Sequence, residues 1–115
     1  MEHRTLDKRP LGNTGLMVSP LGLGTVKFGR NKGVKYPGPF DIPDEASLSG
    51  LLWLAKDLVI NVLDTAPAYG VSEERLGRLL EGQRQDWVIV GKAGEEYSDG
   101  TSVYNFSPAH FEMSL

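Results

Sequence analysis

The stretch that decides the fold is Val59-Ile-Asn-Val-Leu-Asp-Thr-Ala-Pro-Ala-Tyr-Gly-Val-Ser-Glu-Glu-Arg-Leu-Gly77. It opens with β-branched and apolar residues, Val59 to Leu63, which are interrupted only by Asn61. Such a run is typical of a strand that is covered on both faces. The strand is expected to end at Asp64, ahead of a proline and a glycine that break regular structure.

The second half of this stretch predicts a helix from Ser72 to about Glu81. Ser72 is expected to cap the helix, and the two glutamates after it favour the positive end of the helix dipole. Leu76, Leu79 and Leu80 recur at helical spacing, so they are expected to face inward.

The segments on either side predict a repeating pattern of strands and helices. Asp44 is expected to cap an earlier helix, because apolar residues follow it at helical spacing. Its expected inward residues are Leu48, Leu51, Leu52, Ala55 and either Leu58 or Val59. Two short apolar runs, Leu21–Thr25 and Trp87–Val90, predict further buried strands. The alternation of strand, helix, strand, helix and strand predicts an α/β fold with a parallel sheet.

The remaining segments predict a hairpin, a loop and a final helix. Arg9–Ser19 is expected to form two short extended pieces, with Gly15 supplying the positive φ of the turn. Residues 27–43 show no periodicity and predict a long loop. Ser107, followed by Pro108, predicts a helix start. The chain stops about two turns later, which fits either a short frayed helix or a third βα unit that is incomplete.

The composition excludes several classes of protein. The 115 residues include 12 Lys and Arg against 15 Asp and Glu, for a net charge of −3, so no basic surface for nucleic acid is expected. Apolar runs are too short to span a bilayer, and the N-terminus lacks a secretory segment. Without cysteine, and with only His3 and His110, no disulfide or metal site is expected. A cytoplasmic protein is the expectation.

Three polar residues are candidates for catalysis. Asp64 and Lys92 each stand just after a predicted strand, and the carboxyl ends of neighbouring parallel strands meet at one edge of a sheet. Tyr69 lies in the turn after Asp64 and is expected over the same edge. Alternatives are an ion pair with a structural role only and a tyrosine that serves packing.

Together these side chains suit proton transfer. A phenol, with a pKa of about 10, is a poor acid at neutral pH, and a nearby ammonium group lowers that pKa by favouring the phenolate. A carboxylate beside the lysine keeps it charged and oriented. Such a set is typical of general acid–base catalysis at a carbonyl or an alcohol.

Three segments also carry a family resemblance: Arg9-Pro-Leu-Gly-Asn-Thr-Gly-Leu-Met-Val-Ser19, Leu21-Gly-Leu-Gly-Thr25 and Asn61 to Gly77. They resemble the aldo-keto reductase superfamily, whose signature Asp-Thr-Ala-x-x-Tyr-Gly-x-Ser-Glu-x-x-Leu-Gly is similar to the third segment. Lys92, after Val88-Ile-Val-Gly91, matches the family's lysine at a strand end. The resemblance covers nearly the whole chain except for the long loop.

The resemblance implies a fold, a cofactor and a reaction. The fold is the N-terminal part of a (β/α)8 TIM barrel, in which residues 8–19 form a hairpin that plugs the bottom and residues 20–115 form about three βα units. The cofactor is NADP(H), less often NAD(H), and the substrates are small carbonyl compounds or alcohols. No nucleic-acid or membrane partner is implied.

The resemblance also implies roles for individual residues. Tyr69 is the general acid that protonates the carbonyl oxygen as hydride arrives. Lys92, paired with Asp64, lowers the pKa of the tyrosine. Gly24 and Thr25, together with Asp64, lie against the cofactor. No metal takes part.

Two features depart from the family pattern. The family's fourth catalytic residue is a histidine at the end of the next strand, and neither His3 nor His110 stands at that position. The family usually has glycine where Val59 stands, and a valine with positive φ costs about 1 kcal/mol.

The long loop contains Tyr36-Pro-Gly-Pro-Phe40, which has two interpretations. The segment could bind a proline-recognition module in the polyproline II conformation. It could instead overhang the substrate pocket, with Tyr36 and Phe40 lining an apolar site.

The length of the chain leaves three hypotheses. A (β/α)8 barrel takes about 250 residues, so residues 1–115 are expected to form a partial barrel. The first hypothesis is the N-terminal part of a reductase, inactive by itself because later strands supply the histidine and the cofactor site. The second is a non-catalytic module that binds a partner or self-associates through open sheet edges. The third is an independent α/β unit with residual cofactor affinity.

Overall fold

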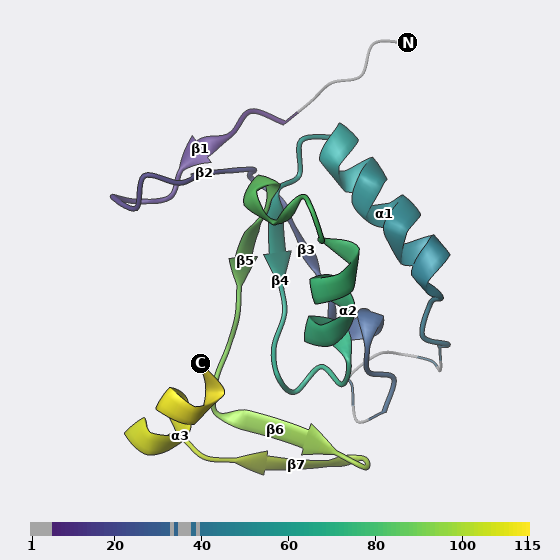
Figure 1. Ribbon diagram of the computed structural model, residues 1–115, viewed down its shortest axis with the longest axis vertical. Coiled ribbons are helices and arrows are strands. Elements are labelled where there is room, and N and C mark those ends of the chain that lie inside the picture. The colour runs from purple at the N-terminus through teal and green to yellow at the C-terminus, as the bar shows by residue number, and fades with distance from the viewer. Residues whose placement is uncertain (1–5, 33, 35–37, 39) are drawn as a thin grey trace.

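The structure is a computed structural model that describes residues 6–32, 34, 38 and 40–115 (Figure 1). The elements are β1 (Arg9–Pro10), β2 (Met17–Val18), β3 (Gly22–Gly24), the 3-10 turn η1 (Val26–Phe28), α1 (Glu45–Asp57), β4 (Val62–Asp64), α2 (Ser72–Leu79), the 3-10 turn η2 (Arg84–Asp86), β5 (Val88–Val90), β6 (Glu95–Ser98), β7 (Thr101–Tyr104) and α3 (Pro108–Ser114). The predictions for His3 and Tyr36 fall outside the described residues.

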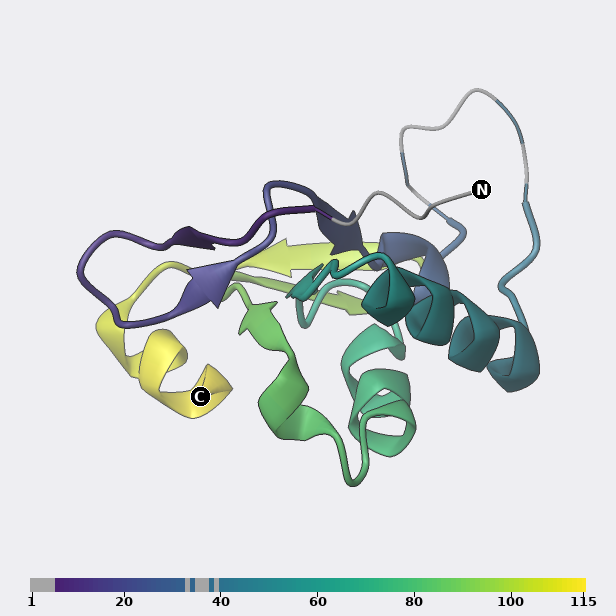
Figure 2. The same ribbon diagram turned by 90° about the horizontal axis from the view of Figure 1, so that it is seen from above.

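A parallel sheet with the strand order β3-β4-β5 forms the centre of the molecule. Helix α1 connects β3 to β4, and α2 connects β4 to β5. Both helices lie on the same side of the sheet (Figures 1 and 2). The predicted α/β architecture with parallel strands, the first part of a TIM barrel, is therefore confirmed.

The sheet has a helix-covered face and an open face. Side chains alternate along each strand, so the middle residues of the three strands share one face: Leu23, Leu63 and Ile89. These residues pack in or against the apolar core under the helices. The next row, Gly24, Asp64 and Val90, belongs to the other face, where Val90 is 44% exposed. The prediction that these strands are covered on both faces is wrong, because the helices cover only one.

The core joins both helices to the sheet. Its buried residues are Phe28, Leu48, Leu52, Ala55, Leu63, Leu76, Leu80 and Trp87. Two predictions need correction. Leu51 was expected to face inward but is 39% exposed, because the buried stripe of α1 is narrower than the apolar pattern. Phe28, expected in a loop, is buried at the end of η1.

Helix α1 has the ends that the sequence predicts. The Asp44 carboxylate accepts a hydrogen bond from the Ser47 N–H at 2.8 Å. At the other end, Val59 has φ 65°. Val59 N–H donates to the Lys56 carbonyl and the next N–H to the Ala55 carbonyl, at 2.9 and 2.8 Å. This Schellman motif requires a left-handed residue. Val59 takes that conformation, which is the condition under which the sequence analysis assigned it a cost of about 1 kcal/mol.

The start of α2 differs from the prediction. Ser72 does not cap the helix but is its first residue, with Val71 at the cap position and no side-chain cap. The Ser72 hydroxyl is buried and hydrogen-bonds with threonine hydroxyls from two strand ends. The helix also ends at Leu79 rather than near Glu81.

A second hairpin, β6–β7, lies in a segment for which the sequence analysis predicted no structure. Asp99 and Gly100 form its two-residue turn, with φ 50° and 81°. Positive φ at both positions is the type I′ geometry that Asp-Gly pairs favour. The Asp-Gly pair was therefore a usable signal that the analysis missed.

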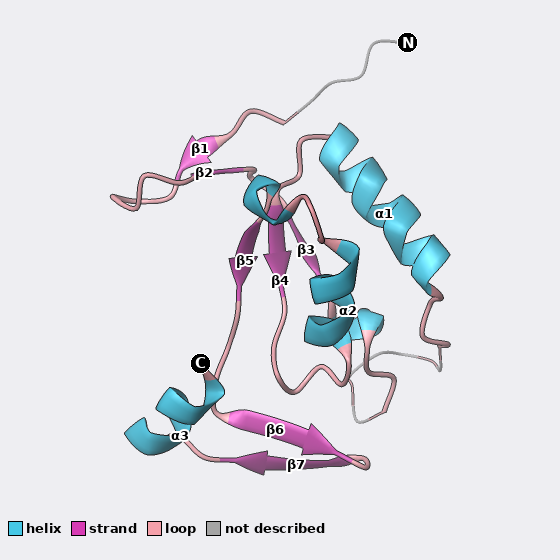
Figure 3. Ribbon diagram, in the orientation of Figure 1, coloured by secondary structure: helices cyan, strands magenta, loops and turns pink. Residues whose placement is uncertain are grey.

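The two hairpins lie at opposite ends of the central sheet (Figure 3). The β1–β2 hairpin is near the amino ends of the strands, and its turn has the expected positive φ at Gly15, 80°. The β6–β7 hairpin is at the carboxyl ends, followed by α3. Ser107 caps α3 as predicted, because its hydroxyl accepts a hydrogen bond from the His110 N–H.

Candidate active site

The carboxyl ends of the three parallel strands bring the predicted catalytic residues together. Asp64 is the last residue of β4 and pairs with Gly24 of β3 and Val90 of β5. Lys92 follows β5 by two residues, and Tyr69 lies in the loop between β4 and α2. All three candidates are thus at the same end of the sheet.

The ammonium group of Lys92 contacts the other two candidates. Its Nζ donates a hydrogen bond to Asp64 Oδ1 at 2.8 Å and another to the Thr65 carbonyl at 3.2 Å. The same Nζ lies 4.8 Å from the centroid of the Tyr69 ring, within the range of a cation–π contact. The Lys92 and Asp64 side chains are 45% and 42% exposed. An ion pair this exposed stabilises the fold little, so its main consequence is the placement of the ammonium group.

The surroundings of Lys92 raise its pKa above the ordinary lysine value. Burial, the largest single influence, lowers the pKa. Hydrogen bonding with Asp64 and Tyr69, together with electrostatic attraction to both groups, outweighs burial. Lys92 therefore carries a positive charge throughout the neutral pH range.

Two glycines hold the backbone of Tyr69 in place. Gly70 has φ 59°, and the Gly29 carbonyl occupies the space that a Cβ at Gly70 would need. A Cβ at Gly29 would in turn collide with the Tyr69 carbonyl and the Ser72 nitrogen. The loops after β3 and β4 thus touch backbone to backbone, which only glycine permits. The sequence analysis did not single out either glycine for this contact.

Buried hydroxyl groups connect the strand ends to α2. Ser72 Oγ lies 2.8 Å from Thr25 Oγ1 and 3.0 Å from Thr65 Oγ1. Thr25 donates to the Asp64 carbonyl through both its hydroxyl, at 2.8 Å, and its N–H, at 3.0 Å. This network fixes the backbone that carries Asp64. Both threonines directly follow strands, a signal that could have indicated the network.

The predicted cofactor-contacting positions differ in their exposure. Gly24 is exposed, and a Cβ built on it would meet nothing within 4 Å. Asp64 is half-buried, whereas Thr25 has no exposed surface. Gly24 and Asp64 therefore provide the open surface at the strand ends. The buried Thr25 hydrogen-bonds to the Asp64 carbonyl and holds its backbone in place.

A small cavity of about 210 Å³ adjoins the candidate residues. Tyr69 and Lys92 line it on one side, and Tyr104 and Phe106 line it at the end of the β6–β7 hairpin. The cavity thus places a phenol and an ammonium group beside apolar walls. Such a site can bind a small organic molecule and exchange a proton with it.

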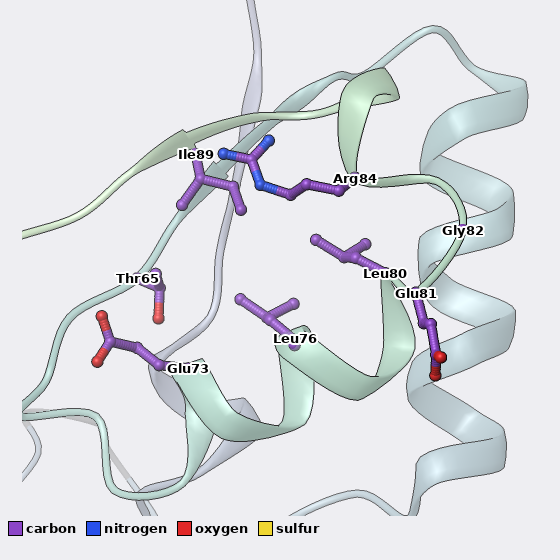
Figure 4. Close-up of a pocket in the computed structure, with 9 residues that line it drawn as sticks. Thr65, Glu73, Leu76, Leu80, Glu81, Gly82, Arg84 and Ile89 are labelled. Atoms are coloured by element: carbon purple, nitrogen blue, oxygen red, sulfur yellow. The ribbon is translucent and has the colours of Figure 1, made fainter.

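Two larger hollows lie away from these side chains. One, of about 300 Å³, separates α2 from β5, and Figure 4 shows Leu76, Leu80 and Ile89 pointing into it. The other, of about 510 Å³, borders the β1–β2 hairpin at the opposite end of the sheet. None of Asp64, Tyr69 and Lys92 lines either one, so we place the candidate site at the cavity of about 210 Å³.

The described residues contain neither a candidate metal site nor a helix that could span a membrane. There is no group of three or more His, Asp or Glu side chains there that could hold a metal ion. No helix in this part of the chain is long and apolar enough to cross a membrane.

Comparison with known proteins identifies one family. Residues 20–115 match the aldo/keto reductase family. The chain is 34% identical over 104 residues to the uncharacterized oxidoreductase YqkF of Bacillus subtilis, covering 89% of this chain and 30% of that protein. It is 33% identical over 115 residues to the L-galactose dehydrogenase of Arabidopsis thaliana, covering 96% and 32%. Pyridoxal 4-dehydrogenase of Microbacterium luteolum is 32% identical over 111 residues, covering 95% and 30%.

A solved structure is also similar. It is a crystal structure of a Pseudomonas aeruginosa protein assigned to the aldo-keto reductases, which is 61% identical and superposes with a TM-score of 0.82. The match covers 96% of this chain and 40% of the P. aeruginosa protein. The chain thus spans about a third of the length of the curated relatives and two fifths of the solved one.

Proposed function

The chain belongs to the aldo/keto reductase family, and from that membership we propose that it supplies the proton-transfer side of an active site for NAD(P)H-dependent reduction of aldehydes or ketones, or the reverse oxidation of alcohols. The observation that carries the proposal is the contact of Lys92 with both Asp64, at 2.8 Å, and the Tyr69 ring, at 4.8 Å from its centroid.

Each of the three side chains has a distinct part in the proposal. The Tyr69 hydroxyl donates its proton to the carbonyl oxygen, and in the reverse direction it accepts a proton from the alcohol. Lys92 stabilises the phenolate that is left, because its ammonium group lies beside the ring. Asp64 holds Lys92 in place through the 2.8 Å hydrogen bond.

The described residues fit one side of a nicotinamide. Gly24 leaves open surface in the same row as Asp64, and a flat ring needs a surface free of side chains. When bound, the cofactor supplies the hydride. We propose NADP(H), with NAD(H) as the alternative, on family membership alone.

For the 115-residue chain alone we propose no catalytic activity. Within the described residues, β3 and β5 each pair with only one strand, and the sheet face opposite the helices is open. The partial-barrel organisation, with residues 8–19 as the hairpin and 20–115 as the first βα units, is part of this proposal, as is a cytoplasmic location.

The open strands also favour one alternative, a non-catalytic module that self-associates. Unpaired strand edges are templates for pairing with another chain. Size-exclusion chromatography distinguishes the two: a stable, monodisperse oligomer of the isolated chain supports the alternative, whereas aggregation or a loosely folded monomer contradicts it.

The test of the proposed activity uses a completed barrel, in which residues 1–115 are fused to the remaining part of the P. aeruginosa relative. Substrates should include small aldehydes, supplied with NADPH or NADH, and also pyridoxal and L-galactose, supplied with NADP+ or NAD+, because two relatives are named as dehydrogenases of these last two compounds. We expect NADPH or NADH oxidation with at least one aldehyde.

The decisive variant of the completed barrel is Tyr69→Phe, which removes only the hydroxyl. Loss of a general acid is expected to lower kcat by roughly 100- to 10,000-fold. Cofactor affinity, measured by nicotinamide fluorescence, should stay nearly unchanged. A folded Tyr69→Phe protein with unchanged kcat would refute the proposed role, as would a folded wild-type barrel that binds NADPH but reduces no aldehyde.

A further inference from the structure

The Arg30 side chain joins three segments that are far apart in the sequence. Arg30 lies just after η1, and its side chain is only 10% exposed. Its Nε donates to the Lys32 carbonyl of its own loop at 2.8 Å. Its Nη1 donates to the Ala68 carbonyl at 3.0 Å and lies 3.4 Å from Glu95 Oε2. Arg30 therefore connects the loop after β3 with the loop after β4 and with the β6–β7 hairpin.

The contact with Ala68 lies next to the proposed general acid in the chain. The Ala68 carbonyl belongs to the peptide group that leads into Tyr69, so the hydrogen bond from Arg30 fixes the orientation of that peptide. The neighbouring Gly29 packs against the Tyr69 carbonyl. Two consecutive residues thus hold the backbone on both sides of Tyr69, while Lys92 lies against its ring.

The β6–β7 hairpin holds Arg30 in this position. Glu95 accepts hydrogen bonds from Arg30 and from the Ser102 hydroxyl, the latter at 2.6 Å. The Arg30 guanidinium carbon also lies over the Tyr97 ring, 4.0 Å from its centroid, within the range of a cation–π contact. Because Arg30 is nearly buried, its charge needs these partners.

The pKa of Glu95 lies below the ordinary glutamate value. The Ser102 hydrogen bond, which lowers the pKa, is the main cause. Burial is the next largest influence and raises the pKa, while Arg30 and Tyr104 lower it further. Glu95 is therefore negatively charged at neutral pH and available to pair with Arg30.

We propose that Arg30 is a positioning residue for Tyr69, oriented by Glu95 and Tyr97. The inference rests on the proposed function, because it assigns Arg30 a role only if Tyr69 transfers the proton. It also gives the β6–β7 hairpin a role in the reaction, since the hairpin supplies both partners that orient Arg30.

The test compares the kcat, the pH–rate profile and the cofactor Kd of the Arg30→Met variant of the completed barrel with those of the wild type. A misplaced catalytic group is expected to lower kcat by roughly 10- to 100-fold. The pH–rate profile should also differ from that of the wild type, because the contact between the Tyr69 ring and Lys92 is altered. Cofactor Kd, measured by nicotinamide fluorescence, should change less than about twofold, since the Arg30 contacts described above lie in the loops after β3 and β4 and in the β6–β7 hairpin.

Two milder variants keep the test decisive if Arg30→Met does not fold. Arg30→Lys retains a donor for the Ala68 carbonyl and should recover part of the lost kcat, but not all of it, because a lysine cannot also reproduce the planar contacts. Glu95→Gln keeps the shape of the side chain and removes its charge, and should lower kcat by roughly threefold, as expected for weakening of a partly exposed ion pair.

A matched control distinguishes the loss of a contact that positions Tyr69 from the general effect of removing an arginine with ion-pair partners. Arg78 also forms two ion pairs, with Glu45 and Glu74, but on the surface of α2. Arg78→Met should keep the wild-type kcat and pH profile.

The outcomes distinguish this inference from the proposed function. If Tyr69→Phe is inactive while folded Arg30 and Glu95 variants keep the wild-type kcat and pH profile, Arg30 does not position Tyr69. If Tyr69→Phe keeps full activity, the proposed function is itself refuted.

Discussion

The two ends of the central sheet carry different kinds of polar contact. At the amino ends, the Asn61 side chain ties the β1–β2 hairpin to β4: its Oδ1 accepts from the Ser19 N–H at 2.7 Å, and its Nδ2 donates to the Met17 carbonyl at 2.8 Å. Asn61 is only 8% exposed. At the carboxyl ends, charged side chains reach solvent, with Asp64 and Lys92 nearly half exposed.

This difference separates stability from function. Buried amide hydrogen bonds are costly to break, because the partners are left without water. Exposed ion pairs contribute little to the free energy of unfolding, but they can orient a reacting group. We therefore expect changes at the amino end to alter folding and changes at the carboxyl end to alter catalysis.

The largest effect is expected at the carboxyl end, from Lys92→Met in the completed barrel. Removing the ammonium group should lower kcat by roughly 100- to 1,000-fold, because Tyr69 loses the charge that stabilises its phenolate. The pH–rate profile should also change, because the charged group beside the Tyr69 ring is gone. A profile identical to the wild type would show that Lys92 does not act on Tyr69.

The stability of Lys92→Met should remain close to that of the wild type. Because the folded-state pKa of Lys92 is raised, any stability from its pairing is fully present below the ordinary lysine pKa and is lost only as the pH rises through the folded value. Between pH 6 and about 9 the two proteins should therefore differ by a constant amount, below about 1 kcal/mol. A pH-dependent difference in urea unfolding within this range would contradict the assignment.

The next largest effect is expected at the amino end, from Asn61→Ala. The change leaves the buried Ser19 N–H without its acceptor and should lower the free energy of unfolding by about 2–3 kcal/mol. Urea unfolding of the completed barrel measures this value. The kcat per folded molecule should not change.

Asn13→Ala provides the control for this experiment, since Asn13 lies in the exposed turn of the same hairpin. Its unfolding free energy should stay within about 0.5 kcal/mol of the wild type. If Asn61→Ala instead reduced kcat and left the free energy of unfolding unchanged, it would be wrong to assign stability to the amino ends of the strands and catalysis to the carboxyl ends.

The smallest effect is expected from Val59→Gly, also at the amino end. Val59 has φ 65°, which a β-branched residue tolerates poorly, so glycine should relieve about 1 kcal/mol of strain. Part of this gain is offset by the greater freedom of glycine in the unfolded chain. A higher Tm with unchanged kcat is the expected result, and a lower Tm would show that Val59 packing outweighs the strain.

The local features of the chain could be predicted because their signals lie within a few residues. Asp44 and Ser107 cap helices through contacts three residues away. The strand ends at Asp64 and before Lys92 followed from short apolar runs. Asp99-Gly100 carried a comparable local signal that the analysis overlooked.

The exposure of side chains was harder to predict. Leu51 and Val90 are apolar and occur in regular elements, yet both are exposed. Apolar spacing shows which residues can be buried, but the area that is buried depends on which neighbours cover the element. In this chain the helices cover one face of the sheet only.

The sequence by itself determined the order of strands and helices in the central sheet, the family and the three candidate catalytic residues, because these depend on local periodicity and a motif. Only the tertiary structure decided that Ser72 joins buried threonines, that Gly29 and Gly70 meet backbone to backbone, and that Arg30 reaches Ala68 and Glu95. Hydrogen bonds act over about 3 Å and depend on direction. Which partners meet across tens of residues is therefore set by how the loops pack, not by any short stretch of sequence.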